Sequence, residues 1–110
     1  MIKISGIQSF RYKRRKITVV FWNNNVWFKA KEIREILGYK ESLTRFTGLL
    51  WDEENKLFKP KANLITEEGL YVLTYHKGLK PKAREKAQEL YDFVQEEVMP
   101  VFEAYIRSWL

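Results

Sequence analysis

The run Ile17–Trp22, followed by three asparagines and Val26–Phe28, constrains the fold more than any other part of the sequence. Its β-branched and aromatic side chains are the ones that favour a pleated sheet. Asparagine tolerates the left-handed backbone of tight turns, so the run 23–25 predicts a hairpin turn. With a further strand over Gly6–Tyr12, we predict an antiparallel sheet of two or three strands. The basic run 13–16 would then lie exposed at the other end of the hairpin.

After this sheet the apolar spacing becomes helical. Apolar residues recur on one helical face from Ala30 to Leu37, and Gly38 predicts the left-handed residue that ends such a helix. We predict a second short helix over 41–50, and then a small second hairpin formed by 56–59 and 62–65.

The last part of the chain is predicted to be helical. Thr66 is a good N-cap for a helix that carries Leu70, Leu73 and Tyr75 and ends before Gly78. We expect Trp27–Phe28 and Leu70–Tyr71 to lie in the core. Pro81 suits the first position of a long final helix, which Pro100 should kink. The apolar face of that helix is expected to consist of Ala83, Ala87, Leu90, Val94, Val98, Val101 and Tyr105.

We therefore predict an α+β fold in a single domain over residues 1–110: a small N-terminal antiparallel sheet packed with helices, and a long kinked C-terminal helix.

Charge is distributed unevenly along the chain. The chain has a formal net charge of +6, yet residues 1–31 contain eight basic residues and no acidic one, because Glu32 is the first acid. The remaining residues carry a net charge of −2. A one-sided positive field attracts polyanions, most often nucleic acid.

Signals for an enzyme are poor. The chain has no cysteine, which excludes disulfides, thiolate zinc sites and a cysteine nucleophile, and His76, its single histidine, fits a capping or surface role. No phosphate-binding loop, dinucleotide fingerprint or nucleophile elbow is present. Asp52 and Glu54 suggest a magnesium nuclease only weakly, since their acidic turn fits a solvated loop better. We expect no catalytic set, no cofactor and no metal site.

Targeting signals are also missing. No apolar run approaches the roughly 18 residues of a membrane span, and residues 1–5 lack the apolar stretch of a secretory signal. We expect an intracellular protein that does not enter a membrane.

Residues 30–46 have the order of a helix-turn-helix motif: a helix, a turn with Gly38, and a second short helix. The second helix of that motif places its N-terminal residues in the major groove, and here these would be Lys40, Ser42 and Arg45. Arg45 is able to read a guanine edge. An ordinary pair of helices packed on the sheet is the alternative interpretation.

Several stretches resemble the Bro N-terminal domain, which is found in baculovirus repeated-open-reading-frame proteins and in phage or prophage antirepressors. They are Val26–Ile33, Leu37–Tyr39, Ile65–Tyr71 and Glu96–Pro100. The resemblance covers roughly residues 17–105. It implies a DNA-binding α+β domain of a viral or prophage regulator, acting in the cytoplasm or nucleoid of the host cell. Glu32 stands where the family commonly has Asp, and the family usually carries a second, C-terminal domain.

The predicted function is binding of double-stranded DNA as a transcriptional regulator. The alternative is an antirepressor module that binds a repressor protein through the Trp109 end or the aromatic face of the sheet. We also predict a homodimer through the C-terminal helix. The predicted phosphate contacts are Arg11, Lys13, Arg14, Arg15 and Lys16, with Lys29, Lys31 and Lys40 as weaker ones, and the predicted base contacts are Ser42 and Arg45.

Overall fold

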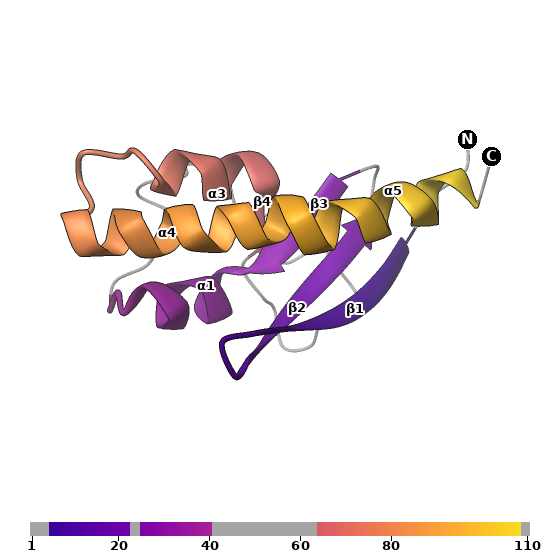
Figure 1. The fold of residues 1–110 in the computed structure, drawn as a ribbon, viewed down its shortest axis with the longest axis horizontal. Coiled ribbons are helices and arrows are strands. Elements are labelled where there is room, and N and C mark those ends of the chain that lie inside the picture. Colours follow the sequence, from indigo (N-terminus) through magenta and orange to yellow (C-terminus); the bar gives the residue numbers. More distant parts are fainter. Residues whose placement is uncertain (1–4, 23–24, 41–63, 109–110) are drawn as a thin grey trace.

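The computed structural model describes residues 5–22, 25–40 and 64–108 and confirms an α+β fold (Figure 1). Its sheet has four antiparallel strands in the order β1-β2-β3-β4 where two or three were predicted. The strands are β1 (Ser5–Tyr12), β2 (Arg15–Trp22), β3 (Asn25–Lys29) and β4 (Leu64–Thr66). The helices are α1 (Ala30–Leu37), α3 (Glu67–Leu73), α4 (Pro81–Phe93) and α5 (Met99–Arg107), with a π-helical stretch (Val94–Val98) between α4 and α5.

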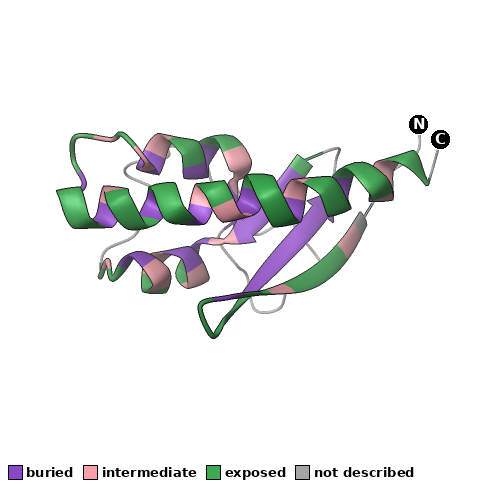
Figure 2. Cartoon of the chain, viewed as in Figure 1, coloured by how far each residue is buried: buried purple, intermediate pink, exposed green. Residues whose placement is uncertain are grey.

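Strand β2 forms the centre of the sheet and is buried on both faces. Ile17, Val19 and Phe21 point to the face that packs against the helices, and Val20 points to the other face with no exposed surface. The predicted hairpin is confirmed, because β2 and β3 pair from Trp22 and Asn25 onward. Figure 2 shows the contrast between the buried β2 and the largely exposed edge strand β1.

Helix α1 begins where β3 leaves the sheet. Its first-turn Glu32 reaches back to β2, where the carboxylate accepts hydrogen bonds from the Thr18 backbone N–H (2.6 Å) and from Thr18 Oγ1 (3.0 Å). The side chain therefore satisfies a strand donor that would otherwise be unpaired in a nearly buried position. The helix ends as predicted at Gly38, which has a φ of 68° and donates to the carbonyls of Arg34 and Glu35.

The predicted second hairpin is corrected in one respect. Residues 64–66 do form a strand, but β4 pairs with β3, with Phe28 opposite Ile65. Residues 56–59 and the predicted helix over 41–50 lie outside the described residues.

Helix α3 follows β4 directly and confirms the predicted N-cap, since Thr66 Oγ1 accepts from the backbone N–H of Gly69 at 3.0 Å. Leu70 and Leu73 are fully buried, but Tyr71 and Tyr75 are 50% and 56% exposed. The prediction that Tyr71 lies in the core is therefore wrong, and Tyr75, which was predicted to belong to this helix, lies beyond its end at Leu73. A seven-residue helix covers the core with only one face, and the leucines fill that face. His76 caps neither helix end: it lies in the α3–α4 connection, where its Nδ1 accepts from the backbone N–H of Gly78 at 2.9 Å.

The long C-terminal helix begins at Pro81 and runs across the helical face of the sheet (Figure 1). The helix continues past Pro100 in Figure 1. The irregularity that we predicted as a kink at this proline takes the form of the π-helical stretch just before it. Pro100 has no N–H to offer to a carbonyl in the preceding turn. In the π turn the Met99 N–H donates to the Val94 carbonyl, five residues earlier.

The π turn also changes which residues face the core. It holds about one residue more than an α turn, so the following side chains are rotated back by roughly 100°. Phe102 is therefore buried (7% exposed) and Val101 is 36% exposed, which corrects the prediction that Val101 lies on the apolar face. Tyr105 still packs on Phe21, with ring centroids 5.2 Å apart.

Candidate nucleic-acid interface

The tip of the β1–β2 hairpin is built from two cations. Tyr12 and Arg15 are the last paired residues of the strands, which leaves Lys13 and Arg14 as a two-residue loop. Both have positive φ values, 48° and 69°, as a type I′ turn requires at its two central positions. Asn and Gly adopt this conformation at least cost, whereas Lys and Arg are uncommon there. The fold thus holds two exposed, long cations in a backbone conformation that disfavours them.

Two further cations face each other across the strands. Arg11 on β1 lies directly opposite Lys16 on β2, so both exposed side chains project from the same face of the sheet. Like charges in this arrangement are destabilising. Arg15 projects to the helical face, since it pairs with Tyr12. We call Arg11, Lys13, Arg14, Arg15 and Lys16 together the hairpin surface.

Two members of the hairpin surface are paired with carboxylates of the helices. Lys13 Nζ contacts Glu89 Oε2 of α4, and Arg15 Nη1 lies 3.9 Å from Glu35 Oε2 of α1. All four side chains are about half to two-thirds exposed, so each pair is a weak surface ion pair. The hydrogen bond to Glu89 raises the pKa of Lys13. Arg11, Arg14 and Lys16 form no ion pair within the described ranges.

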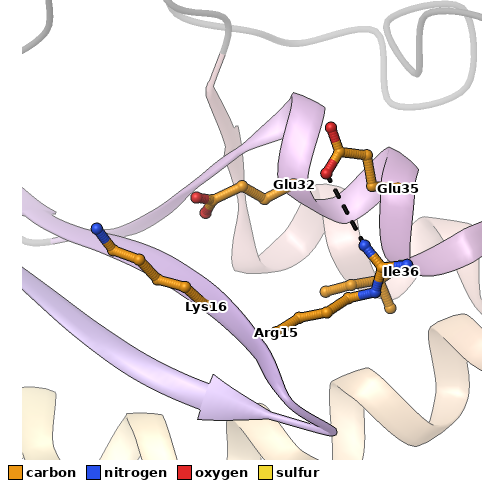
Figure 3. Close-up of a pocket in the computed structure, with 5 residues that line it drawn as sticks. All are labelled: Arg15, Lys16, Glu32, Glu35 and Ile36. Atoms are coloured by element: carbon orange, nitrogen blue, oxygen red, sulfur yellow. Dashed lines mark ion pairs between the residues drawn. The ribbon is translucent and has the colours of Figure 1, made fainter.

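A hollow of about 260 Å³ lies between β2 and α1, lined by Arg15, Lys16, Glu32, Glu35 and Ile36. Figure 3 shows Arg15 reaching to Glu35, with Lys16 and Glu32 on opposite sides of the space. The Glu32 carboxylate is already engaged by Thr18. Among the residues that the structure describes, no three His, Asp or Glu side chains are grouped to hold a metal ion.

The other predicted contacts are more dispersed. Lys29 ends β3 on the same sheet face as Arg11 and Lys16, and is half-buried. Lys31 is exposed in the first turn of α1, and Lys40 is exposed two residues after its end. Ser42 and Arg45, and with them the proposed recognition helix, lie outside the described residues.

A second group of cations was missed by the sequence reasoning. Between residues 77 and 86 the chain holds five basic residues and one acid, Glu85. A local charge count would have found this segment, but the near-neutral total for residues 32–110 concealed it. It spans the α3–α4 connection and the first turns of α4, and we call its cations the α4 cluster: Lys77, Lys80, Lys82, Arg84 and Lys86.

The fold brings the α4 cluster close to the hairpin surface. Lys86 Nζ lies 3.5 Å from the position a Cβ would take on Gly38, so it sits beside the end of α1 and near Lys40. Lys82, Lys86 and Glu89 follow one flank of α4, because residues three and four apart are neighbours on a helix. Glu89 is the residue that contacts Lys13. Lys82 and Lys86 therefore form a row along α4 that leads to Glu89, and Glu89 contacts the tip of the hairpin.

None of the described helices has both the length and the apolar character needed to cross a membrane. Comparison with known proteins identifies one family: the model of the BRO family, N-terminal domain, matches residues 16–100. No curated protein matches the chain. No solved structure matches it either.

Proposed function

Because the chain belongs to the BRO family through its N-terminal domain, we propose that it binds double-stranded DNA and that the hairpin surface contacts the phosphates. The single observation that carries this assignment is the arrangement of cations on the hairpin. Lys13 and Arg14 have positive φ, and Arg11 lies opposite Lys16.

This arrangement is unfavourable for an isolated fold. A cross-strand pair of like charges costs up to about 1 kcal/mol, and each left-handed non-glycine residue costs roughly 1–2 kcal/mol. A polyanion removes the repulsion, because phosphates placed between the side chains neutralise both of them. Strain and repulsion retained at an exposed tip are characteristic of binding sites.

The row formed by Lys82 and Lys86 extends the proposed contact beyond the hairpin. It begins beside the end of α1 and meets the hairpin at the ion pair between Lys13 and Glu89. Glu89 and Glu35 hold two cations in place while the site is empty. Both pairs are exposed and weak, so DNA phosphates are able to replace the carboxylates.

We further propose that the protein is a viral or prophage regulator of transcription acting in the host cytoplasm or nucleoid, with Ser42 and Arg45 reading base edges. Family membership supports the role as a regulator, whereas the assignment of Ser42 and Arg45 rests on their place in the sequence. The second candidate function is an antirepressor that binds a repressor protein. Capture of a repressor by a chain that has no affinity for any duplex would favour this second function.

The test is a fluorescence-anisotropy titration with a labelled duplex of about 20 base pairs over a range of salt concentrations. Six neutralised phosphates give a log–log slope of about −5. Replacing Arg14 and Arg15 together by Ala should weaken all duplexes alike, by about tenfold per lost contact at 0.1 M salt, and reduce the slope by about 1.8.

Arg107→Ala is the control, because it removes an exposed arginine at the far end of α5, where the double variant removes two from the hairpin (Figure 1). It should leave both affinity and slope unchanged. Absence of salt-sensitive binding to any duplex refutes the DNA proposal, and an equal loss in the control refutes the hairpin assignment. Arg45→Ala should additionally blunt sequence preference, whereas equal losses on random and preferred sites would argue against base reading.

A further inference from the structure

Three tyrosine rings form a contiguous aromatic surface: Tyr71 on α3, Tyr75 in the turn that follows α3, and Tyr91 on α4. Tyr71 stacks edge to face on Tyr75, with ring centroids 5.3 Å apart, and also contacts Tyr91 of α4 at 5.2 Å. Tyr71 and Tyr75 are 50% and 56% exposed, and Tyr91 is half-buried. We call these three residues the tyrosine face. It lies outside the hairpin surface and has no part in the proposed DNA contact.

The core does not depend on the exposed rings of Tyr71 and Tyr75, whereas Tyr91 packs partly against it. The core side of α3 is filled by Leu70 and Leu73, both fully buried, while Tyr71 lies on the outer side of the same helix. Contiguous exposed aromatic rings are characteristic of surfaces that bind a partner, since tyrosine combines a large apolar ring with a polar tip.

Three acidic residues lie near Tyr71 and Tyr91, whereas the cation Lys77 follows Tyr75 by two residues. Glu67 and Glu68 lie one turn before Tyr71 on α3, and Asp92 follows Tyr91 on α4. The neighbours that hydrogen-bond to two of these carboxylates are neutral: Gln95 donates to Glu67 at 2.9 Å, and the Gln88 side chain donates to Asp92 at 3.0 Å.

In the described part of the chain none of these three carboxylates is in an ion pair. Burial raises the pKa of Tyr91, and the charges of Glu67 and Asp92 raise it further. Arg84, a member of the α4 cluster, lies on the same flank of α4 two turns before Tyr91. The surroundings of Tyr91, where Glu67 and Asp92 lie, are thus rich in negative charge.

We propose that the tyrosine face binds an arginine- or lysine-bearing segment of a partner protein. The electron-rich faces of the rings attract cations, and the carboxylates beside them lack a cationic partner. Phosphate is repelled by the same carboxylates, which excludes nucleic acid as the ligand. The hairpin remains free in such a complex, because Glu89, which contacts Lys13, and Tyr91 are two residues apart on α4 and face nearly opposite directions.

The proposal is tested with hexa-arginine amide as the probe and the full chain labelled with 15N and 13C for NMR. The protein has a net charge of +6, so long-range electrostatics oppose the binding of this peptide and only a local site captures it. We expect saturable shifts of the ring resonances of Tyr71, Tyr75 and Tyr91. Hexa-glutamate should leave these resonances unmoved.

Two double variants test the two parts of the site. Tyr71→Ser with Tyr75→Ser should weaken the peptide at least fivefold, since each exposed ring contributes about two- to fivefold in affinity. Glu67→Gln with Asp92→Asn should weaken it to a similar degree. Tyr71→Phe with Tyr75→Phe keeps the rings and should keep the affinity. Ile7→Ser is the matched control, because Ile7 is 49% exposed on β1, and it should change nothing.

Duplex affinity should remain within twofold of the wild type in every one of these variants, so this proposal and the DNA proposal fail separately. The proposal is overturned if no binding is detected at hexa-arginine concentrations up to 1 mM, a dissociation constant that corresponds to a binding free energy of about 4 kcal/mol. It is also overturned if both double variants still bind the peptide, which would happen if the peptide attached to Glu96, Glu97 and Glu103 on the same long helix. A DNA duplex that shifts the ring resonances of the three tyrosines would overturn it as well.

Discussion

The contact between Glu32 and Thr18 predicts a large difference in stability between two glutamates of one helix. Glu32→Ala removes a carboxylate that accepts two hydrogen bonds from β2, at 2.6 and 3.0 Å. The Thr18 N–H is then left without a partner in a residue that is only 5% exposed. Glu35→Ala, three residues later, removes an exposed ion pair to Arg15 at 3.9 Å.

The expected magnitudes follow from these two environments. Hydrogen bonds to a charged group contribute about 1.5–3 kcal/mol each, and an unsatisfied buried donor costs about 1–3 kcal/mol. Because Glu32 is only partly buried, we take the lower limit for the two charged hydrogen bonds, about 3 kcal/mol, as the loss in unfolding free energy. This corresponds to a fall of roughly 10–20 °C in Tm. Glu35→Ala should stay within about 0.5 kcal/mol of the wild type.

Urea unfolding followed by tryptophan fluorescence measures both variants under identical conditions. Thr18→Val supplies the intermediate case, because it removes the bond from Oγ1 and keeps the one from the backbone N–H, and should cost about 1 kcal/mol. Adding Thr18→Val to Glu32→Ala should cost little more than Glu32→Ala alone, since both changes act on the same contact. If Glu32→Ala and Glu35→Ala differ by less than 0.5 kcal/mol, this account of how α1 is held to the sheet is wrong.

Three other changes have expected outcomes. Thr66→Ala removes the oxygen that accepts from Gly69 N and should cost about 1 kcal/mol in chemical unfolding, with Thr66→Ser recovering most of the loss. Gly38→Ala should cost about 1 kcal/mol from its φ of 68° alone, because the nearest atom to the new Cβ lies at an ordinary 3.5 Å; a neutral result would contradict the left-handed cap. Glu89→Gln frees Lys13 and should tighten duplex binding and steepen the salt slope by up to about 0.9, and weaker binding would contradict the proposed competition between carboxylate and phosphate.

The carboxylates that meet the hairpin surface were beyond the reach of sequence reasoning. Lys13 and Glu89 are 76 positions apart, so only the packing of α4 over the sheet brings them together. The opening segment contains no acid of its own, yet the fold supplies Glu35 and Glu89 from α1 and α4. Of the five cations that were predicted to contact phosphates from the hairpin, two are therefore already paired with carboxylates in the fold.

The errors on the helices have a related origin. The exposure of Tyr71 depends on which face of α3 meets the sheet, and composition does not report that orientation. The π turn before Pro100 decides that Phe102, and not Val101, faces the core. The other apolar positions predicted for the described helices are buried or packed against the core, among them Leu70, Leu90 and Val94, so the errors are confined to these two positions.

The sequence by itself determined the features that act within a few residues. The hairpin formed by β2 and β3, the end of α1 at Gly38 and the Thr66 cap each depend on local backbone preferences and short-range hydrogen bonds, and their signals lie in adjacent side chains. The family was recognisable for the same reason, because its motifs are short and occur in order.

Tertiary structure alone decided the pairing of β4 with β3, the alignment of the α4 cluster with the hairpin and the meeting of three tyrosines on one surface. These contacts join residues that are distant in the chain, and they form only when burial of a common core fixes how the helices lie on the sheet.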